Sequence, residues 1–259
     1  MKTVRFAALI IIPFLFSCLP KKPEIPMTEV PAGPVLEALE QRRQSFTGLK
    51  AIASVEVVKR GRKRTLENVG VVLDAQRRFR IEAYGPLGQS ELVLVWDGRE
   101  VLERLPGNDR VVRQGAAGLE RLLGEGVGVQ DLCALLSGNI PAGDQPPDAR
   151  LFCGRDNECI LELSRGDVVR RVKVVFPAGP GRVPSMVSQE LFLSGKLVYQ
   201  AKFNRTTEIA HYPLPMNIVI SNPGNNLLLS LVYSDVEVNI PISDEAFLLN
   251  DADSGAEIK

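Results

Sequence analysis

The chain has 259 residues, 45% of them hydrophobic, with 31 basic and 31 acidic side chains. This balance, and the lack of an extended basic stripe, argue against nucleic acid as the main partner. The one histidine, His211, lies far from every cysteine, so no metal site is expected.

The first residues have the layout of an export signal. Lys2 and Arg5 precede an apolar run from Phe6 to Phe16 that only Pro13 interrupts. A helix that spans a bilayer needs about 20 apolar residues, and this run is shorter. We therefore expect residues 1–17 to be a signal peptide that is removed, which leaves 29 basic against 31 acidic residues.

A lipid anchor is expected at Cys18. The segment Leu15-Phe16-Ser17-Cys18 resembles the lipobox of bacterial lipoproteins, which implies a diacylglycerol on the cysteine sulfur. Buried acyl chains, at about 0.8 kcal/mol per CH₂, would hold the protein on a membrane without a spanning helix. The alternative is an ordinary secreted protein with an incidental cysteine.

The residues after Cys18 indicate the membrane to which the protein is sorted, and they predict a tether between the lipid anchor and the folded domain. Leu19 stands where the enteric sorting rule places aspartate for inner-membrane retention, which favours the periplasmic face of the outer membrane. Prolines at positions 20, 23, 26, 31 and 34 predict that residues 18–34 are a semi-extended tether.

Beyond the tether, a short helix is predicted over 35–43, with Leu36 and Leu39 on one face. Alternating apolar and polar residues then predict strands over 50–57, 69–73, 79–84 and 91–96. Leu92 to Trp96 and Leu227 to Val232 do not alternate, so we expect apolar material on both faces of these two strands.

The basic segment Arg60 to Arg64 separates the first two strands. A solvated hairpin turn is favoured over a phosphate-binding patch, although contact with anionic lipid headgroups stays open.

The middle of the chain predicts two helices, over 118–123 and 129–136. Glycines 124, 126 and 128 lie between them and follow a helix, which favours a linker over a phosphate-binding loop. Further strands are expected over 150–154, 158–164, 168–176, 187–194, 197–206, 215–221 and 226–240. Short loops favour hairpins, so the fold class is mainly β, an antiparallel curved sheet capped by helices.

One β-domain over 35–249 and a polar tail over 250–259 are expected, with a short helix at Ser243 to Leu249. Cys153 and Cys159 flank a hairpin loop and are candidates for a local disulfide. Cys133, in an apolar helix, is interpreted as a buried free thiol, while its pairing with either of the others stays open.

A resemblance to the LolA/LolB-like outer-membrane lipoprotein family rests on three segments. They are Tyr84-Gly85-Pro86-Leu87-Gly88-Gln89-Ser90-Glu91-Leu92-Val93-Leu94, the leucine pair of Leu119 to Leu123, and Leu135 to Pro141. The resemblance implies a half-open antiparallel barrel, capped by helices, whose apolar cavity receives acyl chains of other lipoproteins. The extra strands beyond residue 150 and the loop at Pro177 to Pro184 depart from the family.

The resemblance also implies a membrane-insertion loop in which Leu87, supported by Pro86, meets the bilayer. The alternative is an isolated surface leucine. Strand alternation supplies candidates for the cavity, with a fully packed core as the alternative. These candidates are Phe79, Ile81, Leu92, Leu94, Trp96, Leu229 and Leu231.

The first functional hypothesis is an outer-membrane-anchored, non-enzymatic lipoprotein that binds acyl chains or lipoproteins and inserts them into the membrane. Its partners would be the membrane, the acyl chains and a soluble periplasmic carrier. No catalytic residue and no cofactor is proposed, because His211 lies in a turn without a nucleophile motif. The alternatives are an envelope lipoprotein that docks a protein partner, or a carrier of another hydrophobic ligand.

Overall fold

The computed structural model describes residues 27–105, 110–123, 126–141, 148–154, 157–176 and 184–249. The expected signal peptide, Cys18 and the polar tail lie outside the described residues. The described strands form one 14-stranded sheet. They are β1 (Thr28–Val30), β2 (Gly48–Lys59), β3 (Arg62–Asp74), β4 (Phe79–Tyr84), β5 (Ser90–Trp96), β6 (Val101–Arg104), β7 (Val112–Gln114), β8 (Asp148–Cys153), β9 (Glu158–Arg165), β10 (Val168–Val175), β11 (Ser185–Leu193), β12 (Lys196–Ile209), β13 (Tyr212–Asn222) and β14 (Leu227–Val238).

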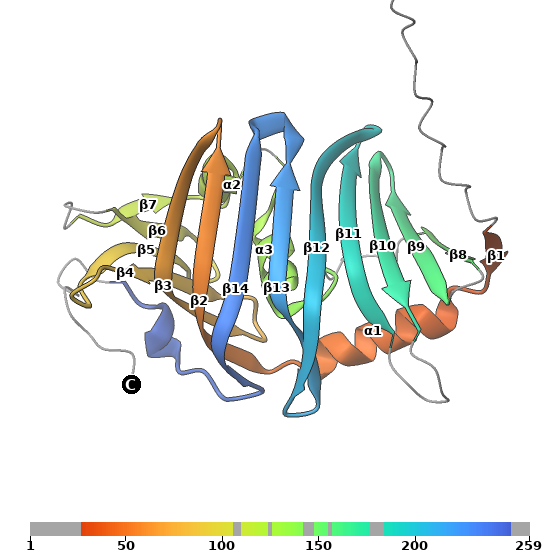
Figure 1. Cartoon of the computed structure of the whole chain (residues 1–259), viewed down its shortest axis with the longest axis horizontal. Coiled ribbons are helices and arrows are strands. Elements are labelled where there is room, and N and C mark those ends of the chain that lie inside the picture. The colour runs from red at the N-terminus through yellow and green to blue at the C-terminus, as the bar shows by residue number, and fades with distance from the viewer. Residues whose placement is uncertain are drawn as a thin grey trace, which may run out of the picture.

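The strand order follows two meanders that meet in the middle of the sheet. The order is β1-β8-β9-β10-β11-β12-β13-β14-β2-β3-β4-β5-β6-β7, and Figure 1 shows these strands side by side. Short turns join most consecutive strands, so they pair as antiparallel hairpins. Two pairings join strands that are distant in sequence: β14 pairs with β2, antiparallel over Leu227↔Lys59 to Val238↔Leu49, and β1 pairs with β8 at one edge of the sheet.

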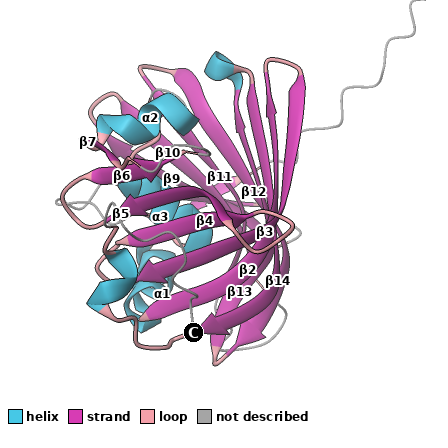
Figure 2. Ribbon diagram, turned by 90° about the vertical axis from the view of Figure 1, so that its left-hand side faces the viewer, coloured by secondary structure: helices cyan, strands magenta, loops and turns pink. Residues whose placement is uncertain are grey.

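Three helices lie on the concave side of this curved sheet (Figure 2). They are α1 (Gly33–Ser45), α2 (Ala117–Leu123) and α3 (Val129–Ser137). Pro34 lies in the first turn of α1, where its fixed φ favours the start of a helix, and α3 ends at Gly138 in the left-handed conformation. The expected mainly β class, a curved antiparallel sheet capped by helices, is confirmed. The expected helix at 243–249 is a shorter 3₁₀ turn, η2 (Asp244–Phe247).

Strand β5 separates two apolar clusters. Leu92, Leu94 and Trp96 belong to the main cluster on the concave side. Val93 and Val95 point the other way, into a smaller cluster that the C-terminal segment covers with Phe247 and Leu249. Cover on both faces is therefore confirmed for β5.

The same expectation was wrong for the outer face of β14. Leu228 lies opposite Val58 on the convex side, and it is 41% exposed. The C-terminal segment packs against β4, which β2 and β3 separate from β14, so it leaves this part of the convex face in solvent.

The proline-rich segment is not a tether throughout its length. Thr28–Val30 form β1, which pairs with β8 from Thr28↔Cys153 to Val30↔Leu151. Val30 also packs against the main apolar cluster. The expectation of a tether over 18–34 was therefore wrong from residue 28 onward, because an extended, proline-flanked segment is also suited to the edge of a sheet.

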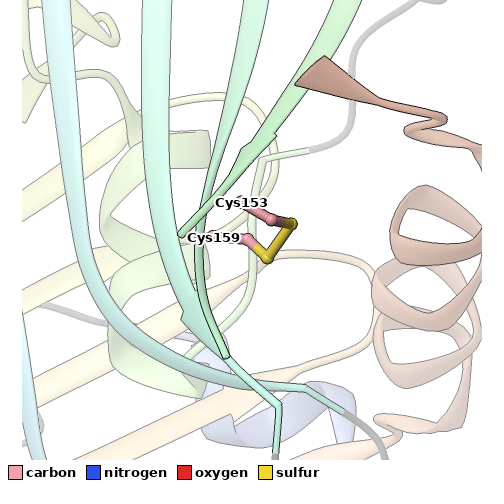
Figure 3. The surroundings of a disulfide bond; sticks show 2 residues. All are labelled: Cys153 and Cys159. Carbon is pink, nitrogen blue, oxygen red and sulfur yellow. A yellow bond between two sulfur atoms is a disulfide. The ribbon is translucent and has the colours of Figure 1, made fainter. Parts of the chain in front are cut away.

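A disulfide joins Cys153 and Cys159, which face each other on β8 and β9 (Figure 3). The sequence separation is 6 residues, so the bond closes a short loop and removes correspondingly little entropy from the unfolded chain. We expect Cys153→Ser/Cys159→Ser to lower the free energy of unfolding by about 2 kcal/mol, measured by urea denaturation. Reducing agent should lower the stability of the wild type by the same amount as the double substitution does, and it should leave the stability of the variant unchanged. If neither the substitution nor the reducing agent changes the stability, this expectation is contradicted.

Candidate functional site

The concave face of the sheet and the three helices share one apolar cluster, here called the concave cluster. The helices contribute Leu39 from α1, Leu119 from α2 and Leu135 from α3, each fully or almost fully buried. Every predicted cavity residue lies in or against this cluster. Phe79, Leu94 and Leu231 are buried members, and Ile81, Leu92, Trp96 and Leu229 are partly buried side chains packed against them.

Strand register explains why residues distant in sequence meet here. Across β4 and β5, Phe79 lies opposite Trp96 and Ile81 lies opposite Leu94, so their side chains share one face of the sheet. Leu229 and Leu231 arrive from β14, which reaches this face because it pairs with β2. The fold thus brings the seven predicted cavity residues to one face of the sheet. Alternation predicts which residues of a single strand share a face, but it does not predict which strands lie side by side.

Burial differs between the two ends of the concave cluster. At one end, the cross-strand partners Leu49, Leu73 and Phe79 are at most 1% exposed. At the other end, Leu227 is 5% exposed, but four apolar side chains that pack against the concave cluster are only partly buried. We call these the mouth residues: Val57, Leu66, Leu92 and Leu229. The concave cluster is therefore more completely covered around Leu49, Leu73 and Phe79, here called the closed edge, than at the edge of the mouth residues.

The β4–β5 loop projects from the edge that carries the mouth residues. Leu87 is 93% exposed, the highest value among the large hydrophobic side chains of the described residues. Pro86 and Gly88 occupy the second and fourth positions of a turn closed by the Gly88 N–H, which donates to the Gly85 carbonyl at 2.9 Å. The Leu87 N–H donates to Gln89 Oε1 at 3.1 Å, so the turn holds the leucine outward.

A buried polar network, which the sequence reasoning missed, ties α3 to the sheet. Arg170 on β10 donates to Asp131 of α3 at 2.7 Å and to the Tyr199 hydroxyl at 2.6 Å. Tyr199 in turn donates to Asp131 at 2.9 Å, and Gln189 donates to Tyr199 at 2.7 Å. The network fixes the first turn of α3 over strands β10 to β12.

Burial and charge act in opposite directions on the Arg170 guanidinium. Desolvation alone would lower its pKa, but Tyr199 and Asp131 outweigh burial and raise it, so Arg170 stays charged. Burial raises the pKa of Tyr199 too, which keeps its hydroxyl protonated and able to donate. A sequence signal did exist: Arg170 alternates with Val172 and Val174, which places a charge on the apolar face of β10.

A small cavity lies at the closed edge, between α1, the β3–β4 turn and α3. Its volume is about 50 Å³, and its lining includes Phe46, Arg77, Cys133 and Asn139 but none of the predicted cavity residues. Cys133 is free, as predicted, and its thiol donates to the Arg77 carbonyl at 3.2 Å. Burial raises the pKa of Cys133 to about 12, so the sulfur stays a thiol at neutral pH and is a poor nucleophile.

His211 lies in the β12–β13 turn, as expected. Its side chain is 99% exposed, and its Nδ1 lies 3.5 Å from a carboxylate oxygen of Glu208, three residues earlier in the chain. A side chain so exposed has no surrounding pocket to hold a substrate. In the described part of the chain, no helix combines the length and hydrophobicity that crossing a membrane requires.

Comparison with solved structures identifies the architecture. A LolA superfamily protein from Nitrosomonas europaea matches with a TM-score of 0.56 and 17% identity, over 85% of this chain and 98% of that one. The chain has the LolA superfamily fold.

Two further structures are similar in fold to this chain. A domain from Vibrio parahaemolyticus described as an outer membrane lipoprotein-sorting protein has a TM-score of 0.55 and 10% identity, over 84% of this chain and 97% of that one. A DUF1329 family protein from Desulfovibrio piger has a TM-score of 0.52 and 13% identity, over the same shares of the two chains. Neither the comparison with family models nor that with curated proteins gave a match.

Proposed function

We propose that this protein is a lipid-anchored envelope carrier that binds acyl chains on its concave cluster and passes them to the outer membrane. Cys18 would hold it on the periplasmic face, and a soluble periplasmic carrier would supply the acyl chains. The likeness to a domain described as a lipoprotein-sorting protein supports a cargo of acylated proteins.

The observation that carries the proposal is the position of Leu87. A leucine that is 93% exposed projects from the edge at which the concave cluster is only partly covered. Burying one leucine side chain in a bilayer is worth about 1.5–3 kcal/mol, which is enough to bring the mouth residues to the membrane without a permanent insertion. The ligand would then move from one apolar environment to another without covalent chemistry.

Two neighbouring leucines on β14 allow a matched test of acyl-chain binding. Leu229 points into the concave cluster, whereas Leu228 points to solvent on the convex face. We expect Leu229→Glu to weaken binding of a fluorescent fatty acid by at least about tenfold, because a carboxylate must be desolvated where the acyl chain would lie. Leu228→Glu should bind like the wild type.

Mass spectrometry of the protein purified without detergent provides the second readout, with a chain that begins at Met27. All described strands and both apolar clusters lie within this shortened chain, so it keeps the packing described above. Co-purified acyl species support the carrier. Protein without lipid, together with equal fatty-acid binding by both β14 variants, would leave the docking of a protein partner as the better explanation.

A further inference from the structure

The β2–β3 hairpin carries a dense group of cations, here called the basic tip: Lys59, Arg60, Arg62, Lys63 and Arg64. All but Lys59 are exposed. Two carboxylates accompany them, since Lys63 lies 2.6 Å from Glu56 and Arg64 lies 4.0 Å from Glu91. The four exposed cations outnumber these two carboxylates, so the basic tip carries a net positive charge.

Turn geometry does not account for the arginine at the apex. Arg60 and Gly61 form a two-residue turn in which both φ angles are positive, +51° and +76°. Such turns favour Asn-Gly, because a residue with a longer side chain is strained in the left-handed region. A cation therefore occupies the apex where local conformation would select asparagine.

The basic tip projects from the same edge of the sheet as the Leu87 loop. Strand β3 runs away from this edge and β4 returns to it, pairing from Leu73↔Phe79 to Asn68↔Tyr84. The 4.0 Å approach of Arg64 to Glu91, at the start of β5, brings the two hairpins together. The mouth residues lie on the concave face at this same edge.

We propose that the basic tip binds the phosphates of anionic phospholipids and so seats the mouth residues and Leu87 on the bilayer. This inference rests on the proposed function and specifies its membrane partner. Each lysine or arginine close to an anionic membrane surface strengthens binding about fivefold, an attraction that salt screens. Leu87 would add an apolar contact that does not depend on the lipid charge.

The test is co-sedimentation of the chain beginning at Met27 with two kinds of vesicle, phosphatidylcholine alone or with about one third phosphatidylglycerol. Arg60→Asn/Arg62→Gln removes two cations and gives the turn its preferred Asn-Gly pair, so the variant should melt no lower than the wild type. We expect it to bind the anionic vesicles about thirtyfold more weakly, and the difference should vanish at high salt. The matched control, Lys202→Gln/Arg205→Gln on β12, removes two exposed cations elsewhere and should bind like the wild type.

The outcomes separate this inference from the proposed function. Equal binding of the wild type to both vesicles, lost in Leu87→Glu, would overturn the headgroup site and leave the carrier intact. An equal loss of binding to the anionic vesicles in Arg60→Asn/Arg62→Gln and in Lys202→Gln/Arg205→Gln would also overturn the headgroup site, because binding would then depend only on the overall charge of the protein. A wild type that binds neither vesicle would contradict the proposed function itself.

Discussion

Leu87→Glu is expected to abolish delivery of other lipoproteins to the outer membrane. The leucine side chain is 93% exposed in a loop whose hydrogen bonds involve backbone groups and Gln89, so the substitution removes no packing from the fold. Loss of one buried leucine contact costs about 1.5–3 kcal/mol, or roughly ten- to hundredfold in membrane affinity, and a carboxylate adds repulsion from anionic lipid. The measurement is the distribution of acylated proteins between inner and outer membranes in cells that carry only the variant.

Two controls make this result specific. Leu228→Glu places the same charge on an exposed leucine of the convex face and should leave delivery unchanged. Fatty-acid binding by Leu87→Glu should equal that of the wild type, because Leu87 lies outside the concave cluster. Normal delivery by Leu87→Glu would show that the loop is an ordinary surface turn.

Among the variants proposed here, Arg170→Met is expected to lose the most stability, with a decrease of about 3–5 kcal/mol in the free energy of unfolding. Methionine matches much of the arginine chain length but leaves Asp131 without its cation inside the protein, where its side chain is only 14% exposed. The Tyr199 hydroxyl would lose one of its partners as well. Urea denaturation followed by circular dichroism measures the change.

The adjacent residue provides the matched control for Arg170. Arg171 points to the convex face and pairs with Glu162 at 2.9 Å, with its side chain 48% exposed. Arg171→Met should change stability by no more than about 1 kcal/mol. Adding Asp131→Asn to Arg170→Met should recover part of the loss, because it removes the unpaired charge and keeps an acceptor for Tyr199. Equal effects of the two methionine variants would refute the view that the buried network anchors α3.

In the proposed carrier, helix α3 and the mouth residues would have separate roles. Helix α3 covers the concave cluster, and the Arg170 network fixes its first turn to β10, β11 and β12. On the other side of that cluster, the mouth residues of β2, β3, β5 and β14 are only partly buried. Ligand entry is therefore expected at the edge near Leu87, with α3 remaining in place.

Local sequence patterns predicted most of the strands and helices, because the hydrophobic period and the conformational preferences of turn residues act over a few residues. Alternation located β4, and the continuous apolar run of β5 correctly implied cover on both faces. The same rule failed for β14, since the C-terminal segment that covers β5 does not extend to Leu228. The exposed loop at Leu87 was expected from the family resemblance alone, and the preferences of Pro86 and Gly88 fit the turn that the structure shows.

The sequence alone determined most of the strands, the hairpins and the capping helices, because hydrophobic period and glycine or proline turns are encoded within short windows. Only the tertiary structure decided which distant segments meet. The pairing of β14 with β2, the insertion of β1 beside β8, and the contact of Asp131 with Arg170 depend on long-range register. The same register places the basic tip beside Leu87, because strands that alternate in direction return every second turn to the same edge of the sheet.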